Sequence, residues 1–126
     1  MPPLREWGEG PVTLLGDAAH AMLPFLAQGA AMAIEDAAVL ARCLAQAPGD
    51  VMSALRAYED KRRVRTAQVQ QASRRNGAIY HHSGPEALFR NLGMRLVGGR
   101  RLFARYDWIY DWRDDGAKAK AKAGLA

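Results

Sequence analysis

The 126-residue sequence lacks several features that would assign it to a class of protein. It has a single cysteine, Cys43, which cannot form an internal disulfide and whose small and apolar neighbours favour a buried, inert thiol. No run of 18 apolar residues exists, and the first residues lack the charged-then-apolar order of a secretory signal. The sequence therefore predicts a cytoplasmic protein without a membrane span or cysteine redox chemistry.

Signatures of metal and nucleic-acid binding are also missing. His81 and His82 are adjacent, so on a helix they would point in different directions and make a poor pair of metal ligands. No helix-turn-helix, zinc-finger or RNA-binding aromatic pattern occurs, although the basic half of the chain would suit a nucleic-acid partner. We therefore expect no metal and no nucleic-acid partner.

Positive charge is scarce in the first part of the chain and abundant in the second. Residues 1–54 hold two basic and six acidic side chains, whereas residues 55–126 hold 16 basic and seven acidic ones, for a net charge of +5. This asymmetry indicates that the two parts meet different environments. Residues 114–126 are lysine-rich and have no apolar face, so they are predicted to form a disordered basic tail after a folded unit of residues 1–113.

Breaker residues divide the first third of the chain. Residues 12–15 form a short apolar run that ends at Gly16, which fits a single buried strand, and Trp7 is the expected anchor of the irregular segment before it. Pro24 and Gly29 interrupt residues 17–29, so this segment is predicted to form a short helical turn followed by a loop.

The remainder predicts helices. Residues 30–47 form a small-residue helix, and Asp50 is placed to cap a helix that continues to Gly77 or as far as His81. A further helix is predicted over residues 85–96, with Pro85 at its first position. The expected buried stripe of the long helix comprises Val51, Leu55, Tyr58, the stems of Arg62 or Arg65, Val69 and Ala72, with Glu59, Asp60, Lys61 and Arg63 in solvent. The aromatic residues expected to pack against the body, with an interface as the alternative, are Tyr106, Trp108, Tyr110 and Trp112.

The most informative segment follows the predicted strand. Its polar and small residues are Gly16-Asp17-Ala18-Ala19-His20, then Pro24, then Gln28-Gly29-Ala30-Ala31 at the start of a helix. A carboxylate after a strand can accept hydrogen bonds from sugar-like hydroxyls, and a glycine before a helix lets a ligand approach free backbone donors. The same residues also fit a helix cap at Asp17 and a turn at Gly29, so the segment alone leaves both interpretations open. We expect His20 to be packed or capping, and Glu35 and Asp36 to complement the helix dipole.

The order and spacing of these residues closely resemble the C-terminal flavin-binding motif of the FAD-dependent aromatic monooxygenases, especially the salicylate hydroxylase-like branch. The resemblance covers residues 7–112 and is densest over residues 12–37. It continues through Ala54-Leu55, Tyr58-Glu59, Arg62, Arg65, Ser73, Tyr80-His81, Arg90-Asn91 and Asp107-Trp108-Ile109-Tyr110.

The resemblance implies a role for each residue of the motif. Asp17 would bind the ribityl chain of FAD, Gly16 would allow close backbone approach, and Pro24 would lie beside the isoalloxazine near the substrate. The set implied to bind FAD also includes Gln28 and the backbone of Gly29, Ala30 and Ala31, whose donors would point at the pyrimidine end of the ring. A helix N-terminus suits that place because it supplies about half a positive charge where the reduced flavin is negative. The family uses NAD(P)H and oxygen to hydroxylate an aromatic substrate.

The sequence departs from the family pattern in two respects. The G-x-G-x-x-G fingerprint that binds the ADP half of FAD does not occur in these residues, and the substrate-binding sheet is missing. We therefore expect a mostly α chain with one short strand, forming the C-terminal part of an α/β, Rossmann-type FAD-binding fold. Alone it should bind FAD weakly or not at all, and no catalytic residue is identified. The alternative is a noncatalytic helical module that associates with itself or with a related enzyme.

Overall fold

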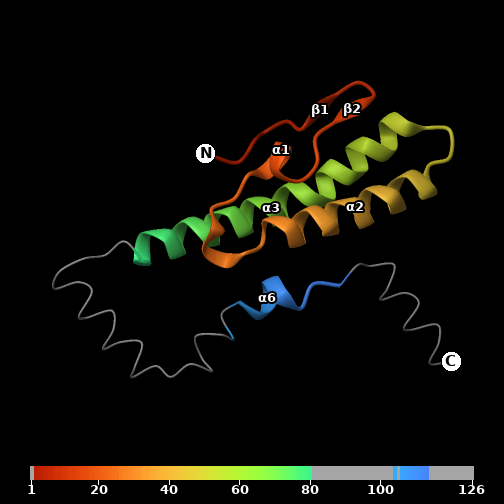
Figure 1. Cartoon of the computed structure of the whole chain (residues 1–126). Helices are drawn as coiled ribbons and strands as arrows, with labels where there is room; N and C mark the ends of the chain where they lie inside the picture. Colours follow the sequence, from red (N-terminus) through yellow and green to blue (C-terminus); the bar gives the residue numbers. More distant parts are fainter. Residues whose placement is uncertain (1, 81–103, 105, 114–126) are drawn as a thin grey trace, which may run out of the picture.

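The computed structural model describes residues 2–80, 104 and 106–113, which are mostly helical (Figure 1). The long helices α2 and α3 lie side by side, with a small hairpin and α1 on one side of α3 and the short helix α6 on the opposite side of the pair. In chain order the elements are β1 (Gly8–Glu9), β2 (Val12–Thr13), α1 (Asp17–His20), the 3-10 helix η1 (Pro24–Leu26), α2 (Gly29–Gln46), α3 (Val51–Tyr80) and α6 (Asp107–Tyr110). The prediction of a mostly helical chain is confirmed.

The prediction of one buried strand over residues 12–15 is wrong. β2 pairs antiparallel with β1, with Gly8 opposite Thr13 and Glu9 opposite Val12. Gly10 begins the connecting loop with a φ of 53°, which is the conformation that a tight two-residue hairpin needs at this position. The ribbon lies at the surface, where Val12 is 63% exposed, because only one of its faces meets α3.

The two long helices match their predicted positions. A helical turn at α1, an interruption at Pro24 and a helix from Gly29 all follow the breaker pattern. The backbone N–H of Ser53 donates to the Asp50 carboxylate at 3.0 Å, so the predicted cap of α3 is confirmed. α3 continues through Gly77 to Tyr80, whereas the predictions for His81, residues 85–96 and the tail 114–126 lie outside the described residues.

The buried face of α2 carries two carboxylates, although the sequence predicts a small-residue helix. Ile34 is 71% exposed, whereas Glu35 and Asp36 are buried beyond the first turn of the helix. Their expected role at the helix dipole is therefore wrong. Arginine side chains of α3 bind both carboxylates, so charge pairing decides which face of α2 turns inward. The buried residues of α2 are Met32, Glu35, Asp36, Val39 and Cys43.

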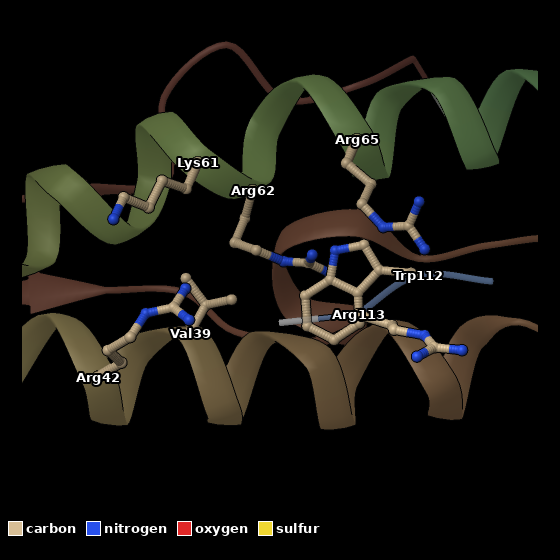
Figure 2. Close-up of a pocket in the computed structure, with 7 residues that line it drawn as sticks. All are labelled: Val39, Arg42, Lys61, Arg62, Arg65, Trp112 and Arg113. Carbon is tan, nitrogen blue, oxygen red and sulfur yellow. The ribbon is translucent and has the colours of Figure 1, made fainter. Parts of the chain in front are cut away.

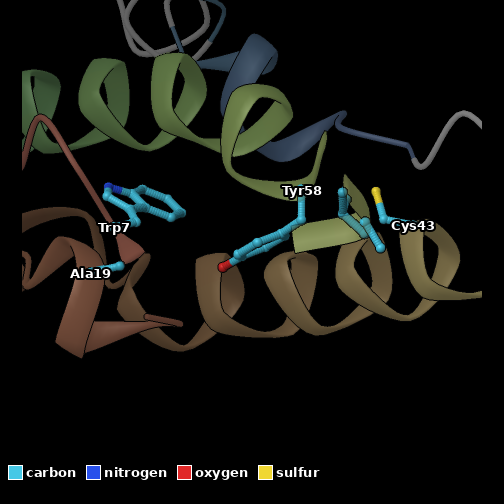
Figure 3. Close-up of a cluster of buried hydrophobic side chains, with 6 residues drawn as sticks. Trp7, Ala19, Cys43 and Tyr58 are labelled. Carbon is cyan, nitrogen blue, oxygen red and sulfur yellow. The ribbon is translucent and has the colours of Figure 1, made fainter. Parts of the chain in front are cut away.

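Two apolar clusters hold these elements together. The first joins the N-terminal segment to both helices and contains Trp7, Ala19, Val39, Cys43, Ala54 and Tyr58. Figure 3 shows Tyr58 of α3 lying between Trp7 and Cys43, so the predicted anchor and the buried free thiol are both confirmed. The second cluster ties α6 to the helix pair through Leu26, Met32, Val69 and Ile109.

The predicted stripe of α3 is correct except at its first residue, Val51. Leu55, Tyr58 and Val69 are buried, but Val51 is half exposed. Glu59, expected in solvent, is buried because its carboxylate accepts a hydrogen bond from the Thr13 hydroxyl at 2.6 Å. The hairpin, which the sequence did not predict, therefore covers the start of this helix.

The aromatic segment divides into two sets. The Tyr106 hydroxyl donates to the Asn76 side chain at 2.6 Å, and the Trp112 ring lies under arginine side chains of α3. These two aromatic residues pack as predicted, whereas Trp108 and Tyr110 are exposed and Ile109 is the buried residue of α6. Among the described residues, no helix is long and apolar enough to cross a membrane, and no three metal-binding side chains cluster.

Candidate functional site

The start of α1 is pressed against the start of α2. Gly16 precedes α1 with φ 61° and ψ −137°, and a Cβ on this residue would lie 3.2 Å from the Cβ of Ala33. Asp17 then begins α1 with an exposed carboxylate, whose Oδ1 lies 3.6 Å from where a Cβ on Gly29 would be. Glycine at position 16 thus permits the close approach that brings the Asp17 carboxylate beside the first residue of α2.

The N-terminus of α2 offers free backbone donors at the same place. Its first helical bond runs from the Met32 N–H to the Gln28 carbonyl at 2.9 Å, which leaves the N–H groups of Gly29, Ala30 and Ala31 without helical acceptors. Gln28 supplies no side-chain cap. An acceptor-rich or anionic ligand group is therefore favoured here by both the donors and the helix dipole.

The other two residues of the predicted set shape this region. The Gln28 side chain is buried and its amide donates to the Leu26 carbonyl at 3.3 Å, so it holds the turn before α2 together. Pro24 is exposed at the first position of η1. The carboxylate of Asp17 and the donors of residues 29–31 fit a polyol beside a polar ring edge, as in the ribityl chain and pyrimidine end of FAD.

A buried carboxylate supports this site from behind. Asp36 accepts hydrogen bonds from the Gly16 N–H at 3.1 Å, His20 Nε2 at 2.5 Å and Arg62 Nε at 2.6 Å. Burial acts to raise the pKa of Asp36, but the hydrogen bonds from these three donors outweigh it and the pKa lies below its usual value. Burial, followed by the charge of Asp36, raises the pKa of the Tyr58 hydroxyl.

His20 is packed, as predicted. Its ring lies 5.4 Å from that of Trp7, and its Nε2 faces Asp36, while its Nδ1 is buried without a hydrogen-bond partner. The ring thereby ties the end of α1 to α2.

The acidic and basic parts of the chain meet inside the molecule. Glu35 binds Arg62 at 2.8 Å and both Nε and Nη2 of Arg65 at 2.7 Å. Figure 2 shows the two arginines of α3 reaching toward Trp112, and each guanidinium lies 5.5 Å from the ring centroid. The prediction that the two halves meet different environments is therefore wrong for this part of the chain. The surrounding pocket of about 150 Å³ is lined by Val39, Arg42, Lys61, Arg62, Arg65, Trp112 and Arg113.

Sequence reasoning missed this ion network. A usable signal existed, because the adjacent acids Glu35 and Asp36 fall on one helix while Arg62 and Arg65 are spaced three apart on the next. Such spacing places both arginines on one face of α3.

Comparisons with known proteins identify the family of this chain. A family model described as "FAD binding domain" matches residues 3–73. The 3-hydroxybenzoate 6-hydroxylase of Klebsiella oxytoca is 40% identical over 113 residues, which is 90% of this chain and 28% of that protein. The salicylate hydroxylase of Pseudomonas putida is 40% identical over 126 residues, covering 96% of this chain and 28% of the relative.

A solved structure shows the same likeness. The structure titled "Salicylate hydroxylase substrate complex" superposes with a TM-score of 0.65 at 35% identity, covering 94% of this chain and 28% of that one. The chain thus spans between a quarter and a third of the length of these relatives. Because the family model covers more than half of the sequence, the chain belongs to the FAD binding domain family, and it is similar to flavoproteins named as aromatic hydroxylases and monooxygenases.

Proposed function

We propose that this chain forms the wall of an FAD site in an aromatic-ring hydroxylase. The Asp17 carboxylate accepts hydrogen bonds from ribityl hydroxyls, and the N–H groups of residues 29–31 donate to the pyrimidine end of the flavin. The observation that carries the proposal is the exposed Asp17 carboxylate beside the uncapped N-terminus of α2. Pro24 follows on the same connecting segment, where we propose it borders the ring.

The substrate and co-substrate are part of the same proposal. Relatives are named for hydroxylation of 3-hydroxybenzoate, salicylate and 6-hydroxynicotinate, which supports an aromatic small molecule as substrate. When bound and reduced by NAD(P)H, FAD supplies the oxygen chemistry. The described residues bind and orient the cofactor, and Asp36 holds the Gly16 turn that presents Asp17.

The described residues offer one open wall, with Asp17, Pro24 and Ala30 exposed. Affinity for a cofactor as large as FAD requires burial of most of its surface. We therefore propose that this chain by itself binds FAD weakly, and that it has no hydroxylase activity alone.

A titration that detects weak binding tests the site. FAD added to ¹⁵N-labelled protein is expected to shift the backbone amide resonances of Asp17 and residues 29–31. Asp17→Ala should weaken the interaction about tenfold, because it removes a charge-assisted acceptor. Asp60→Ala, which removes an exposed carboxylate of α3, is the matched control and should leave the affinity unchanged.

Two results would contradict the proposal. Amide shifts that avoid α1 and the start of α2, or an FAD affinity that is unchanged in Asp17→Ala, would contradict the proposed flavin site. Stoichiometric retention of yellow FAD through gel filtration would instead show that the chain alone suffices, and would overturn the weak-binding part only.

Noncatalytic self-association is the second candidate function. The outward face of α2 carries Ile34 together with exposed Ala30, Ala37 and Ala41, which recur at helical spacing. A second copy of the chain could cover this face. Sedimentation velocity across a concentration series tests the idea, and a monomer at all concentrations would contradict it.

A further inference from the structure

The pocket of about 150 Å³ beside Trp112 collects positive charge from three parts of the chain. Five of its seven lining residues are cationic, and no carboxylate belongs to its described lining. One cation comes from α2, three come from α3 and one follows α6. A cleft lined by one sign of charge raises the local concentration of its counter-ion, so this convergence favours a bound anion.

Two of these cations form a fixed inner wall. Arg62 is buried and binds Asp36 at 2.6 Å and Glu35 at 2.8 Å, while Arg65 binds Glu35 at 2.7 Å. Both guanidinium groups also lie 5.5 Å from the centroid of the Trp112 ring. Their charges are therefore compensated within the protein, and their side chains hold the pocket in shape.

The outer cations reach the pocket from opposite helices. Figure 2 shows Arg42 of α2 and Lys61 of α3 extending into the space between the two helices. Lys61 is exposed, and among the residues that the structure describes it forms no ion pair. Arg113 lies 3.9 Å from the Asp111 carboxylate, but both side chains are more than 70% exposed and solvent weakens the pair. An anion in the pocket would therefore meet cations from both helices without displacing a buried ion pair.

We propose that this pocket binds a phosphate group, held by Arg42 and Lys61. A phosphate ester at pH 7 carries about −1.5 to −2 charges and three acceptor oxygens, so it suits cations from two helices at once. The guanidinium presents a planar fork that matches two phosphate oxygens, and the ammonium acts as a point charge. An engineered cavity of about 150 Å³ holds benzene, so one phosphate group fits and the body of an ester would lie outside.

The lining residues disfavour an apolar ligand. The apolar ones are Val39, which is buried, and Trp112, whose ring two guanidinium groups approach. Charge therefore selects the ligand, and a phosphate dianion is favoured over a monoanionic carboxylate. None of these residues belongs to the proposed flavin site, so failure of either proposal leaves the other standing.

Inorganic phosphate is the first probe and glycerol 3-phosphate the second. Each is titrated into the ¹⁵N-labelled full chain at pH 7 and constant ionic strength, with acetate as the monoanionic control. Saturable shifts are expected in the backbone amides of Arg42 and Lys61 and in the indole N–H of Trp112. Acetate should cause none at the same concentrations, and the amides of residues 29–31 should stay unshifted. Tighter binding of the ester supports an ester as the source of the phosphate group, and tighter binding of inorganic phosphate supports the free ion.

Lys61→Gln should weaken phosphate binding about tenfold, since it removes one of the two contacting charges. Because Lys61 is exposed, the variant should keep its helical circular dichroism. Arg75→Gln is the matched control, since Arg75 is exposed on the same helix and the change in net charge is the same. This position lies about 21 Å further along the helix axis, beyond two Debye lengths at physiological ionic strength. The control should therefore change the phosphate affinity less than twofold.

Four results would overturn the proposal. The first two are the absence of saturable phosphate shifts and acetate binding as tight as that of phosphate. The third is a Lys61→Gln variant that loses no more phosphate affinity than Arg75→Gln. The fourth is a set of phosphate shifts confined to residues 29–31, which would place the anion at the N-terminus of α2 instead.

Discussion

Replacing Asp36 by asparagine is expected to destabilise the protein more than any exposed charge change. The carboxylate has no exposed surface, and its two oxygens accept hydrogen bonds from Gly16, His20 and Arg62. Asparagine has nearly the same volume, so packing stays intact. It has only one acceptor oxygen, however, and its NH₂ group must face one of the three donors.

The expected loss of unfolding free energy in Asp36→Asn follows from the charges that stay buried after the substitution. Removing one partner of a buried ion pair costs about 3–5 kcal/mol, because the other charge stays buried. Arg62 keeps its second partner, Glu35, at 2.8 Å, which places the expected loss near the lower limit of about 3 kcal/mol. For a urea m-value of about 1.5 kcal/mol/M, the unfolding midpoint should fall by about 2 M.

Equilibrium urea unfolding at pH 7, followed by circular dichroism, measures this change. Asp60→Asn is the control, since its carboxylate is 70% exposed and pairs with Arg63 one turn away on α3. That variant should change the free energy of unfolding by no more than about 0.5 kcal/mol. If Asp36→Asn lost no more stability than Asp60→Asn, the reasoning about the buried network would be refuted.

Two further predictions concern the same region. The lowered pKa of Asp36, compared with 3.8 for the free group, means that the unfolded chain takes up the proton first on acidification. The Asp36 carboxylate therefore contributes its full stabilisation above pH 3.8, and this contribution is lost as pH falls through the pKa of the folded state. Between pH 7 and pH 2, the urea midpoint should decline less steeply in Asp36→Asn than in the wild-type protein. Parallel declines would contradict this prediction. Gly16→Ala should cost about 2 kcal/mol, because φ is 61° and the new Cβ would crowd Ala33 at 3.2 Å. Gly10→Ala, with φ 53° and open space around it, should cost less when both variants are compared by urea unfolding, and an equal or larger loss there would be inconsistent with crowding at Ala33.

Local signals predicted the helices well. Pro24, Gly29 and Asp50 act within a few residues of themselves, by removing a backbone donor, starting a helix or accepting from a first-turn N–H. Such effects require no knowledge of the rest of the chain. The hairpin was not predicted because its pairing depends on a turn at Gly10 and on a surface supplied by α3. Arg56 of α3 donates hydrogen bonds to the backbone carbonyls of the hairpin.

The resemblance named the residues of the proposed site but gave no indication of what supports them. In the structure, Asp17 Oδ1 lies 3.6 Å from where a Cβ on Gly29 would be. The pattern of small and apolar residues did not indicate which face of α2 is buried, because hydrophobic residues are the ones normally expected inside. Here Glu35 and Asp36 are buried, since arginines on α3 compensate their charge.

The sequence by itself determined the helix boundaries and membership of a flavin-binding family, since both depend on residue types at short, fixed spacing. Tertiary structure alone decided which groups became partners across long separations. It brought Asp36 under the Gly16 turn and Glu35 beside Arg62 and Arg65. The physical reason is that the free energy of a buried charge depends on the groups that surround it in space, which no local pattern specifies.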